Sequence, residues 1–191
     1  IKALRTSLKD QEKEIRTSIK RARKLLETNN FFDALGNFQE ALVNTEMFYE
    51  KKAILDALSN KPYKLKDFHS VLYLQNKITT MIAAVNVVVV KGDMQSIGMG
   101  KRLPKPIRFK VSFNDNQYSF PISGAVINLS YASGKLIDTQ NTNINEDEIE
   151  FSYIVIDKQV HPDFARGKKG PQKCNIKVIT TKRTRKDIQE V

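Results

Sequence analysis

The first part of the chain has apolar side chains at helical spacing. They advance in steps of three, four and seven residues, which places them on one side of a helix. Asp10, Glu12 and Glu14 lie among lysines and arginines three or four positions away, so several ion pairs are expected on the solvent side. The pattern predicts a long amphipathic helix from Ile1 to about Thr28, with its apolar side formed by Ile1, Leu4, Leu8, Ile15, Ile19, Ala22 and Leu26.

Two asparagines separate this helix from a second one. Asn29 and Asn30 suit the position, because Asn tolerates the left-handed conformation that ends helices and also caps the next helix. The second predicted helix begins at Phe31 or Phe32 and ends at Leu58. So short a turn requires the two helices to pack antiparallel. The apolar positions of the second helix are Ala34, Leu35, Phe38, Ala41, Leu42, Thr45 and Phe48.

A third helix is predicted after Pro62, which ends the second helical segment. It runs from about Leu65 to Ala84, and three helices then form an antiparallel bundle domain over residues 1–84. The apolar side expected for the third helix consists of Leu65, Phe68, Leu72, Gln75, Ile78 and Ile82.

At Val85 the spacing changes from helical to alternating. The segment "VNVVVVKGD" is β-branched and ends in a Gly-Asp turn signal. About seven short strands follow from this region onward, with no helical stretch between them, and this spacing is typical of an immunoglobulin-like antiparallel sandwich. The sequence therefore predicts an α+β protein whose second domain spans residues 85–191. The expected strands are residues 85–90, 107–113, 118–121, 125–131, 135–139, 148–156 and 174–180.

The segment "NNFFDALGNFQEAL" resembles one tetratricopeptide repeat. Asn29 stands where that family has glycine, and Glu46 stands near the expected proline. The pattern does not recur between Ala53 and Met81, whereas stacked arrays need about three repeats. The resemblance implies a single tetratricopeptide-like hairpin within a helical bundle, not a peptide-binding superhelix. The matching positions are Asn29, Phe31, Ala34, Phe38, Ala41 and Leu42.

A second resemblance covers more of the chain. A helical segment followed by "LPKPIRFKVSF" and "FPISGAVINLSYASGKL" is similar to envelope lipoproteins of diderm bacteria, in which helices precede an immunoglobulin-like domain of the invasin-repeat kind. The resemblance implies a periplasmic or outer-membrane protein that works by contact, and it carries over no site residues. Since the first residue is Ile1, a signal peptide or lipid anchor upstream would not be visible. The positions that match a strand, a turn and the next strand are Pro121, Gly124, Ala125, Val126, Ile127, Leu129, Gly134 and Leu136.

The distribution of basic residues along the chain indicates candidate contact residues. The formal net charge is +11, and basic residues are densest in the stretches from Lys2 to Lys24 and from Lys158 to Lys186. Such patches raise nucleic acid and anionic lipid as partners, although solvated lysine-rich faces have the same composition. The candidate partner-binding residues are Lys20, Arg21, Arg23, Lys24, Phe48, Tyr49, Lys168, Lys169, Lys173 and Lys177.

No catalytic or metal-binding pattern emerges. The chain has two histidines, His69 and His161, and one cysteine, Cys174, which are poor material for a zinc site or a catalytic triad. The acidic stretch "NTNINEDEIE" lacks the glycine of an EF-hand loop, and neither "GMGKRLPKP" nor "ARGKKGPQK" fits a phosphate-binding loop. We therefore expect a protein that is not an enzyme and uses no cofactor.

Two functions stay open. The first is a non-enzymatic cell-envelope protein, in the periplasm or at the outer membrane, that binds or scaffolds another envelope protein and has its anchor upstream. The alternative is a binder of nucleic acid or another anionic polymer through the basic C-terminal strip. The strip has few aromatic residues for stacking on bases, which favours the first function.

Overall fold

The computed structural model describes residues 1–65, 69–92, 95, 104–131, 136–141, 149–151 and 174–179, and its side chains as far as Ile127. The chain divides into two compact units, Ile1–Ala84 and Val85–Val191. The first is helical and the described part of the second contains antiparallel sheets, so the α+β class is confirmed.

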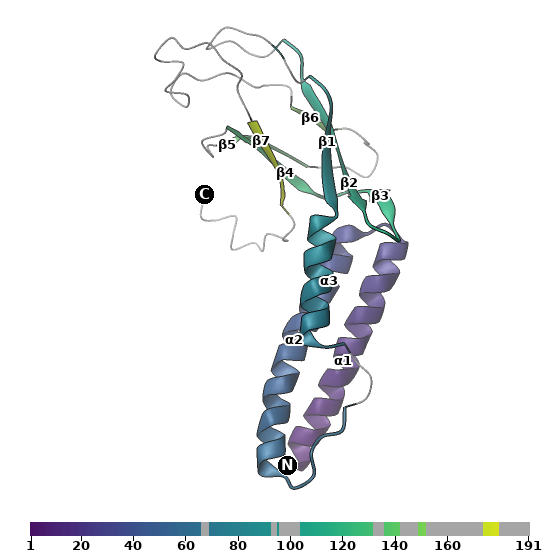
Figure 1. Ribbon diagram of the computed structural model, residues 1–191, viewed down its shortest axis with the longest axis vertical. Helices are drawn as coiled ribbons and strands as arrows, with labels where there is room; N and C mark the ends of the chain where they lie inside the picture. Colours follow the sequence, from purple (N-terminus) through teal and green to yellow (C-terminus); the bar gives the residue numbers. More distant parts are fainter. Residues whose placement is uncertain are drawn as a thin grey trace. The chain divides into compact units, whose positions relative to one another are not determined.

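The helical unit is built on a long antiparallel hairpin (Figure 1). Helix α1 spans Lys2–Glu27 and helix α2 spans Phe31–Leu58, which confirms both predicted helices. A whole tetratricopeptide repeat has about 34 residues, whereas α1 has 26 and α2 has 28, so the hairpin is longer than one such repeat. Small and large apolar side chains alternate in its core, which includes Leu8, Ile15, Ala22, Leu26, Phe31, Ala34, Phe38, Ala41, Phe48 and Leu55, all at most 2% exposed.

The turn between these helices has the predicted asparagine chemistry. Asn29 has a φ of 58°, in the left-handed region that ends a helix. The side chain of Asn30 accepts a hydrogen bond of 3.3 Å from the backbone N–H of Asp33 and so caps α2. Two adjacent asparagines therefore end one helix and begin the next.

Helix α3 differs from the prediction in its start and in its buried side. It spans Val71–Ala83, because the Ser70 hydroxyl caps it by accepting a hydrogen bond of 3.2 Å from the N–H of Tyr73. The predicted apolar side is wrong: Leu72 is 65% exposed, whereas Leu74 and Met81 are buried. Leu65 and Ile82 are exposed too, and Phe68 lies outside the described residues. Apolar residues occupy more than one side of this short helix, so periodicity alone could not select its packing face.

Polar contacts fix the segment that joins α2 to α3. The Tyr63 hydroxyl donates a hydrogen bond of 3.1 Å to Oε2 of the buried Glu12, and the Tyr63 N–H donates one of 2.9 Å to Oδ1 of Asp56. The ring of Tyr63 also meets Phe48 edge to face at 5.8 Å. Burial raises the pKa of Tyr63, and its hydrogen bond to Glu12 adds to the shift. The connection is thereby attached to both helices of the hairpin.

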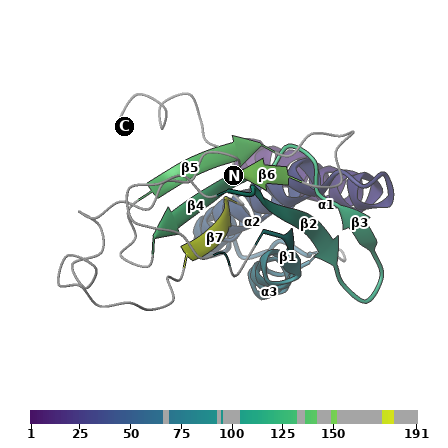
Figure 2. The ribbon, with the colours of Figure 1, turned by 90° about the horizontal axis from the view of Figure 1, so that it is seen from above.

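The second unit contains two antiparallel sheets in its described part. In one sheet, β2 (Ile107–Asn114) pairs with β1 (Val85–Lys91) along one edge and with β3 (Ser119–Pro121) and β6 (Ile149–Phe151) along the other. In the other sheet, β4 (Val126–Tyr131) lies between β5 (Leu136–Asn141) and β7 (Cys174–Ile179), as Figure 2 shows. All seven predicted strands are present, although most of the sixth prediction lies outside the described residues.

Alternation along β2 separates a buried side from an exposed one. Phe109, Val111 and Phe113 are at most 4% exposed, whereas Arg108 and Lys110 between them are exposed. The helical spacing ends at Ala83 and the strand spacing begins at Val85, as expected. β4 and β5 pair as antiparallel neighbours.

Gly92, directly after β1, provides a test of this sheet. It has a φ of +87°, and a methyl group there would lie 2.0 Å from the carbonyl oxygen of Pro106. Gly92→Ala should therefore destabilise the sheet unit by at least about 1–3 kcal/mol. Gly36→Ala is the matched control, because the same methyl group meets nothing within 4 Å in α2 and should stabilise the helix by about 0.5–1 kcal/mol. Urea unfolding followed by NMR signals of each unit measures both, and equal effects would contradict the geometry.

Candidate functional site: a basic groove on the first helix

Three arginines of α1 are held by contacts within the helical unit. Arg5, Arg16 and Arg23 are spaced by eleven and seven residues, so they share one side of the helix. Arg5 donates to the Ser59 hydroxyl at 3.0 Å, and Arg16 donates to Oε1 of Glu12 at 2.8 Å. Arg23 reaches Nε2 of His69 at 2.9 Å. The guanidinium groups of Arg5 and Arg23 therefore link α1 to other parts of the bundle, whereas Arg16 forms its pair within α1.

The lysines of α1 behave differently. They follow one another at intervals of seven, four, seven and four residues, which keeps them on one side of the helix over about 33 Å. All are exposed, and none forms an ion pair with a residue that the structure describes. We call this set the lysine stripe; it consists of Lys2, Lys9, Lys13, Lys20 and Lys24.

Most of the ion pairs expected along α1 are absent from the described residues. Glu12 pairs with Arg16, but Asp10 and Glu14 have no such partner there. By helical geometry, Asp10 and Glu14 lie to one side of the lysine stripe, about 60–120° around the axis from Lys13 and Lys20. The stripe therefore keeps its full positive charge.

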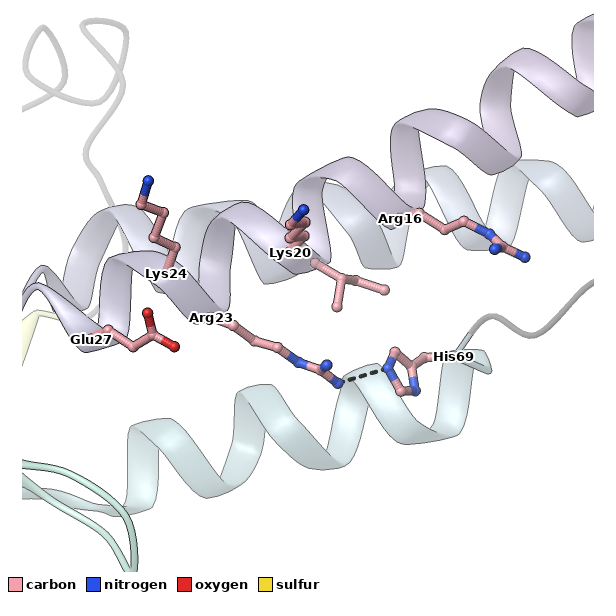
Figure 3. A pocket seen from close by; sticks show the side chains of 7 residues that line it. Arg16, Lys20, Arg23, Lys24, Glu27 and His69 are labelled. Atoms are coloured by element: carbon pink, nitrogen blue, oxygen red, sulfur yellow. Dashed lines mark hydrogen bonds between the residues drawn. The ribbon is translucent and has the colours of Figure 1, made fainter.

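At the C-terminal half of α1 the stripe borders a groove of about 700 Å³. Figure 3 shows Arg23 extending toward His69 at the start of α3, while Lys20 and Lys24 turn away from α3. The lining carries four cationic side chains and one carboxylate, so its field is positive. The lining residues are Arg16, Ile19, Lys20, Arg23, Lys24, Glu27 and His69.

His69 is held in a defined protonation state at the wall of this basic groove. Its ring stacks on Tyr73 with centroids 3.9 Å apart. Because arginine only donates hydrogen bonds, Nε2 of His69 must be the acceptor and its proton must be on Nδ1. Burial lowers the pKa of His69, and the positive charge of Arg23 lowers it further. The groove therefore contains a neutral imidazole.

The structure brings together some of the predicted contact residues. Lys20, Arg23 and Lys24 line the basic groove, whereas Arg21 is exposed but does not line it. Phe48 is 0% exposed, so its prediction as a contact residue is corrected: it packs in the core against Tyr63. Tyr49 is 37% exposed on α2.

Most candidate residues of the basic C-terminal strip are not placed by the structure. Lys168, Lys169 and Lys173 lie outside the described residues. Lys177 lies in β7, opposite Asn128 of β4.

Sequence reasoning missed Arg16 and His69. The regular spacing of Arg5, Arg16 and Arg23 was a signal available in the sequence. His69 joins the groove only because α3 packs back on the hairpin, which no local pattern reveals.

Comparison with protein-family models, curated proteins and solved structures gives no match. Within the described residues, no group of three or more His, Cys, Asp or Glu side chains is placed to hold a metal ion. In the same part of the chain, no helix is both long enough and apolar enough to cross a membrane.

The protonation of His69 is testable. Its folded pKa lies below the unfolded value of about 6.5, so its contribution to stability is present above pH 6.5 and is lost as the pH falls through the folded pKa. An NMR titration of the ring should give a pKa below 6.5. Arg23→Gln should raise that pKa without restoring 6.5, because burial is the larger cause. A pKa at or above 6.5 in the unsubstituted protein would refute the assignment.

Proposed function

We propose that this protein is a non-enzymatic cell-envelope protein whose helical unit binds an acidic segment of another protein in the basic groove. The observation that carries the proposal is the pair Lys20 and Lys24, whose ammonium groups have no ion-pair partner in the described part of the chain. Arg16 and Arg23 line the same groove. A partner segment with several carboxylates therefore meets several cations along α1.

Energetics favour a segment with several acidic residues over a single ion. One exposed ion pair contributes about 0–1 kcal/mol, because water screens it. A row of cations on a rigid helix adds such contacts and also steers an anionic partner during encounter. Among the described residues of the groove lining, His69 is the one with a ring, and a single ring offers little stacking surface for nucleotide bases. An acidic protein segment fits these features better than single-stranded nucleic acid.

The second unit fits the same proposal as an immunoglobulin-like sandwich. Support comes from its two antiparallel sheets and from the buried side of β2, since a sandwich requires an apolar inner side on each sheet. Together with the envelope-lipoprotein resemblance, this favours a protein placed in the periplasm or at the outer membrane that scaffolds a neighbour there. The identity of that neighbour does not follow from the fold.

Substitution of the two unpaired lysines tests the groove. A fluorescent Glu-rich peptide should bind the full chain, and Lys20→Glu with Lys24→Glu should weaken binding at least about tenfold, the equivalent of 1.4 kcal/mol. Lys61→Glu with Lys64→Glu is the control, because these exposed lysines lie outside the groove lining. Binding should also weaken with added salt. Equal losses in both variants, or stronger binding of an oligonucleotide of equal charge, would contradict the proposal.

The compartment needs a separate measurement. Fractionation of the native cells, followed with an antibody against the chain, should place the protein in the envelope fraction. A cytoplasmic enzyme and a periplasmic marker serve as controls for leakage. Recovery with the cytoplasmic marker would refute the envelope assignment. It would not bear on the proposal that the basic groove binds an acidic segment.

A further inference from the structure

Strand β1 has an open edge in the described part of the chain. It pairs with β2 on one side, and no other described strand pairs with its second side. Its regular register runs from Val85 opposite Phe113 to Val89 opposite Phe109, and a register shift follows before Lys91. A strand edge presents a row of backbone N–H and C=O groups, which another extended chain satisfies in regular order. We therefore expect the occupant of this edge to be a β-strand.

A hydrogen bond of β2 identifies the residues of β1 that face the open edge. The C=O of Val111 accepts a hydrogen bond of 3.0 Å from the N–H of Ile122, so the backbone of Val111 faces β3. Directly opposed residues of an antiparallel pair either bond to each other or both point away from the pair. Val87 is opposite Val111, so its backbone points away from β2. Because this direction alternates along a strand, the outward residues of the regular stretch are Val85, Val87 and Val89.

The side chains of these three valines lie on the buried side of the sheet. Directly opposed residues share one side of a sheet, and the residues opposite the valines are Phe113, Val111 and Phe109, all at most 4% exposed. Phe109 is 0% exposed, whereas Val89 opposite it is 41% exposed. The apolar side of the sheet is thus only partly covered at β1, and an added strand would continue it.

Strand β1 has few of the features that commonly protect an edge strand. Natural edge strands carry charged residues, proline or bulges that oppose pairing with another chain. Residues 85–90 are five valines and one asparagine, with no charge and no proline. The register shift and the first charged residue, Lys91, come after residues 85–89. Pairing of these five residues with another strand is therefore unopposed.

We propose that β1 pairs with β1 of a second copy of the chain, antiparallel and centred on Val87. A two-fold axis at Val87 sets Val85 of each copy opposite Val89 of the other, and Val87 opposite Val87. Three pairs that each exchange two backbone hydrogen bonds give about six bonds. These bonds use every outward backbone group of residues 85–89. Asn86 lies opposite Val88, so no like charges meet.

A second copy closes the edge of both strands at once. The strand that it adds is already paired with β2 of its own copy on the other side, so no new open edge results. An isolated extended segment of another protein would leave its own second side open. The buried side of the sheet also continues from one copy into the other, since both contribute the same valines.

Hydrogen exchange on the full chain tests the pairing. The amides of Val85, Val87 and Val89 should be protected at high protein concentration and should lose that protection on dilution. The amides of Asn86 and Val88 alternate with them and bond to β2, so they should stay protected and serve as the internal control. Protection of all five that is unchanged on dilution would show that another part of the chain covers the edge, and would overturn the proposal. Rapid exchange of the three outward amides at every concentration would also overturn it.

Proline at position 87 gives the decisive variant. Val87→Pro removes the outward N–H and with it both bonds of the central pair, whereas pairing with β2 does not use that N–H. It should weaken dimerisation at least about tenfold, the equivalent of 1.4 kcal/mol, as measured by sedimentation equilibrium. Val87→Thr keeps the N–H and the branched shape, so it is the matched control and should dimerise as the unsubstituted chain does. Equal dimerisation of the two variants would contradict the pairing.

A second variant and the salt dependence complete the test. Val89→Lys leaves the backbone unchanged but adds a charge to each joined edge, so it should also weaken dimerisation, while protected Asn86 and Val88 amides show an intact sheet. Added salt should strengthen dimerisation, because each copy carries a net charge of +11 and the paired strands form no ion pair. Binding of the Glu-rich peptide to the basic groove should weaken instead, which separates the two results. Dimerisation that weakens with salt would refute a backbone-mediated interface.

Discussion

The helical unit depends on the left-handed turn at Asn29. Because that residue ends α1 and Asn30 immediately caps α2, two helices of 26 and 28 residues must lie antiparallel along nearly their whole length. Close packing then requires one side of each helix to be apolar, with Ala22, Ala34 and Ala41 allowing the backbones to approach. The opposite sides remain outside the core. Both the lysine stripe of α1 and an apolar stripe of α2, formed by the exposed Val43, Met47, Ile54 and Leu58, are consequences of this geometry.

Arginine and lysine have different roles on α1 because their side chains differ in chemistry. A planar guanidinium with five donors suits fixed, partly buried contacts, whereas a compact ammonium is strongly hydrated and stays in water. Arg5, Arg16 and Arg23 accordingly reach Ser59, Glu12 and His69. Glu12 is buried and accepts from both Arg16 and Tyr63, so its charge is compensated inside the bundle. The positive charge that remains for a partner is mainly that of the lysines.

Sequence reasoning succeeded where a local signal was strong. The boundaries of α1 and α2 followed from long amphipathic patterns and from the asparagine pair, and the strands followed from alternation. It failed for α3, whose mixture of Leu72, Leu74 and Ile82 permits several packing sides, so the choice was made by contact with α2. It also placed Phe48 on the surface, although Phe48 continues the buried row of Phe31 and Phe38. The groove was predicted in part, because Lys20, Arg23 and Lys24 are close in sequence. His69 lines the groove only because α3 packs against the hairpin.

An exposed charge or apolar residue is ordinary by itself, and what distinguishes the two stripes is that residues of one kind occupy a whole side of each helix. The lysines repeat at seven and four residues because one side of a helix recurs at this spacing, and they have no ion-pair partner among the described residues. The apolar stripe repeats at four, seven and four on a helix whose other side already supplies the core. A solvated surface has no need for that second apolar row, which adds exposed apolar area and favours non-specific association. Its retention is best explained by a surface that covers it.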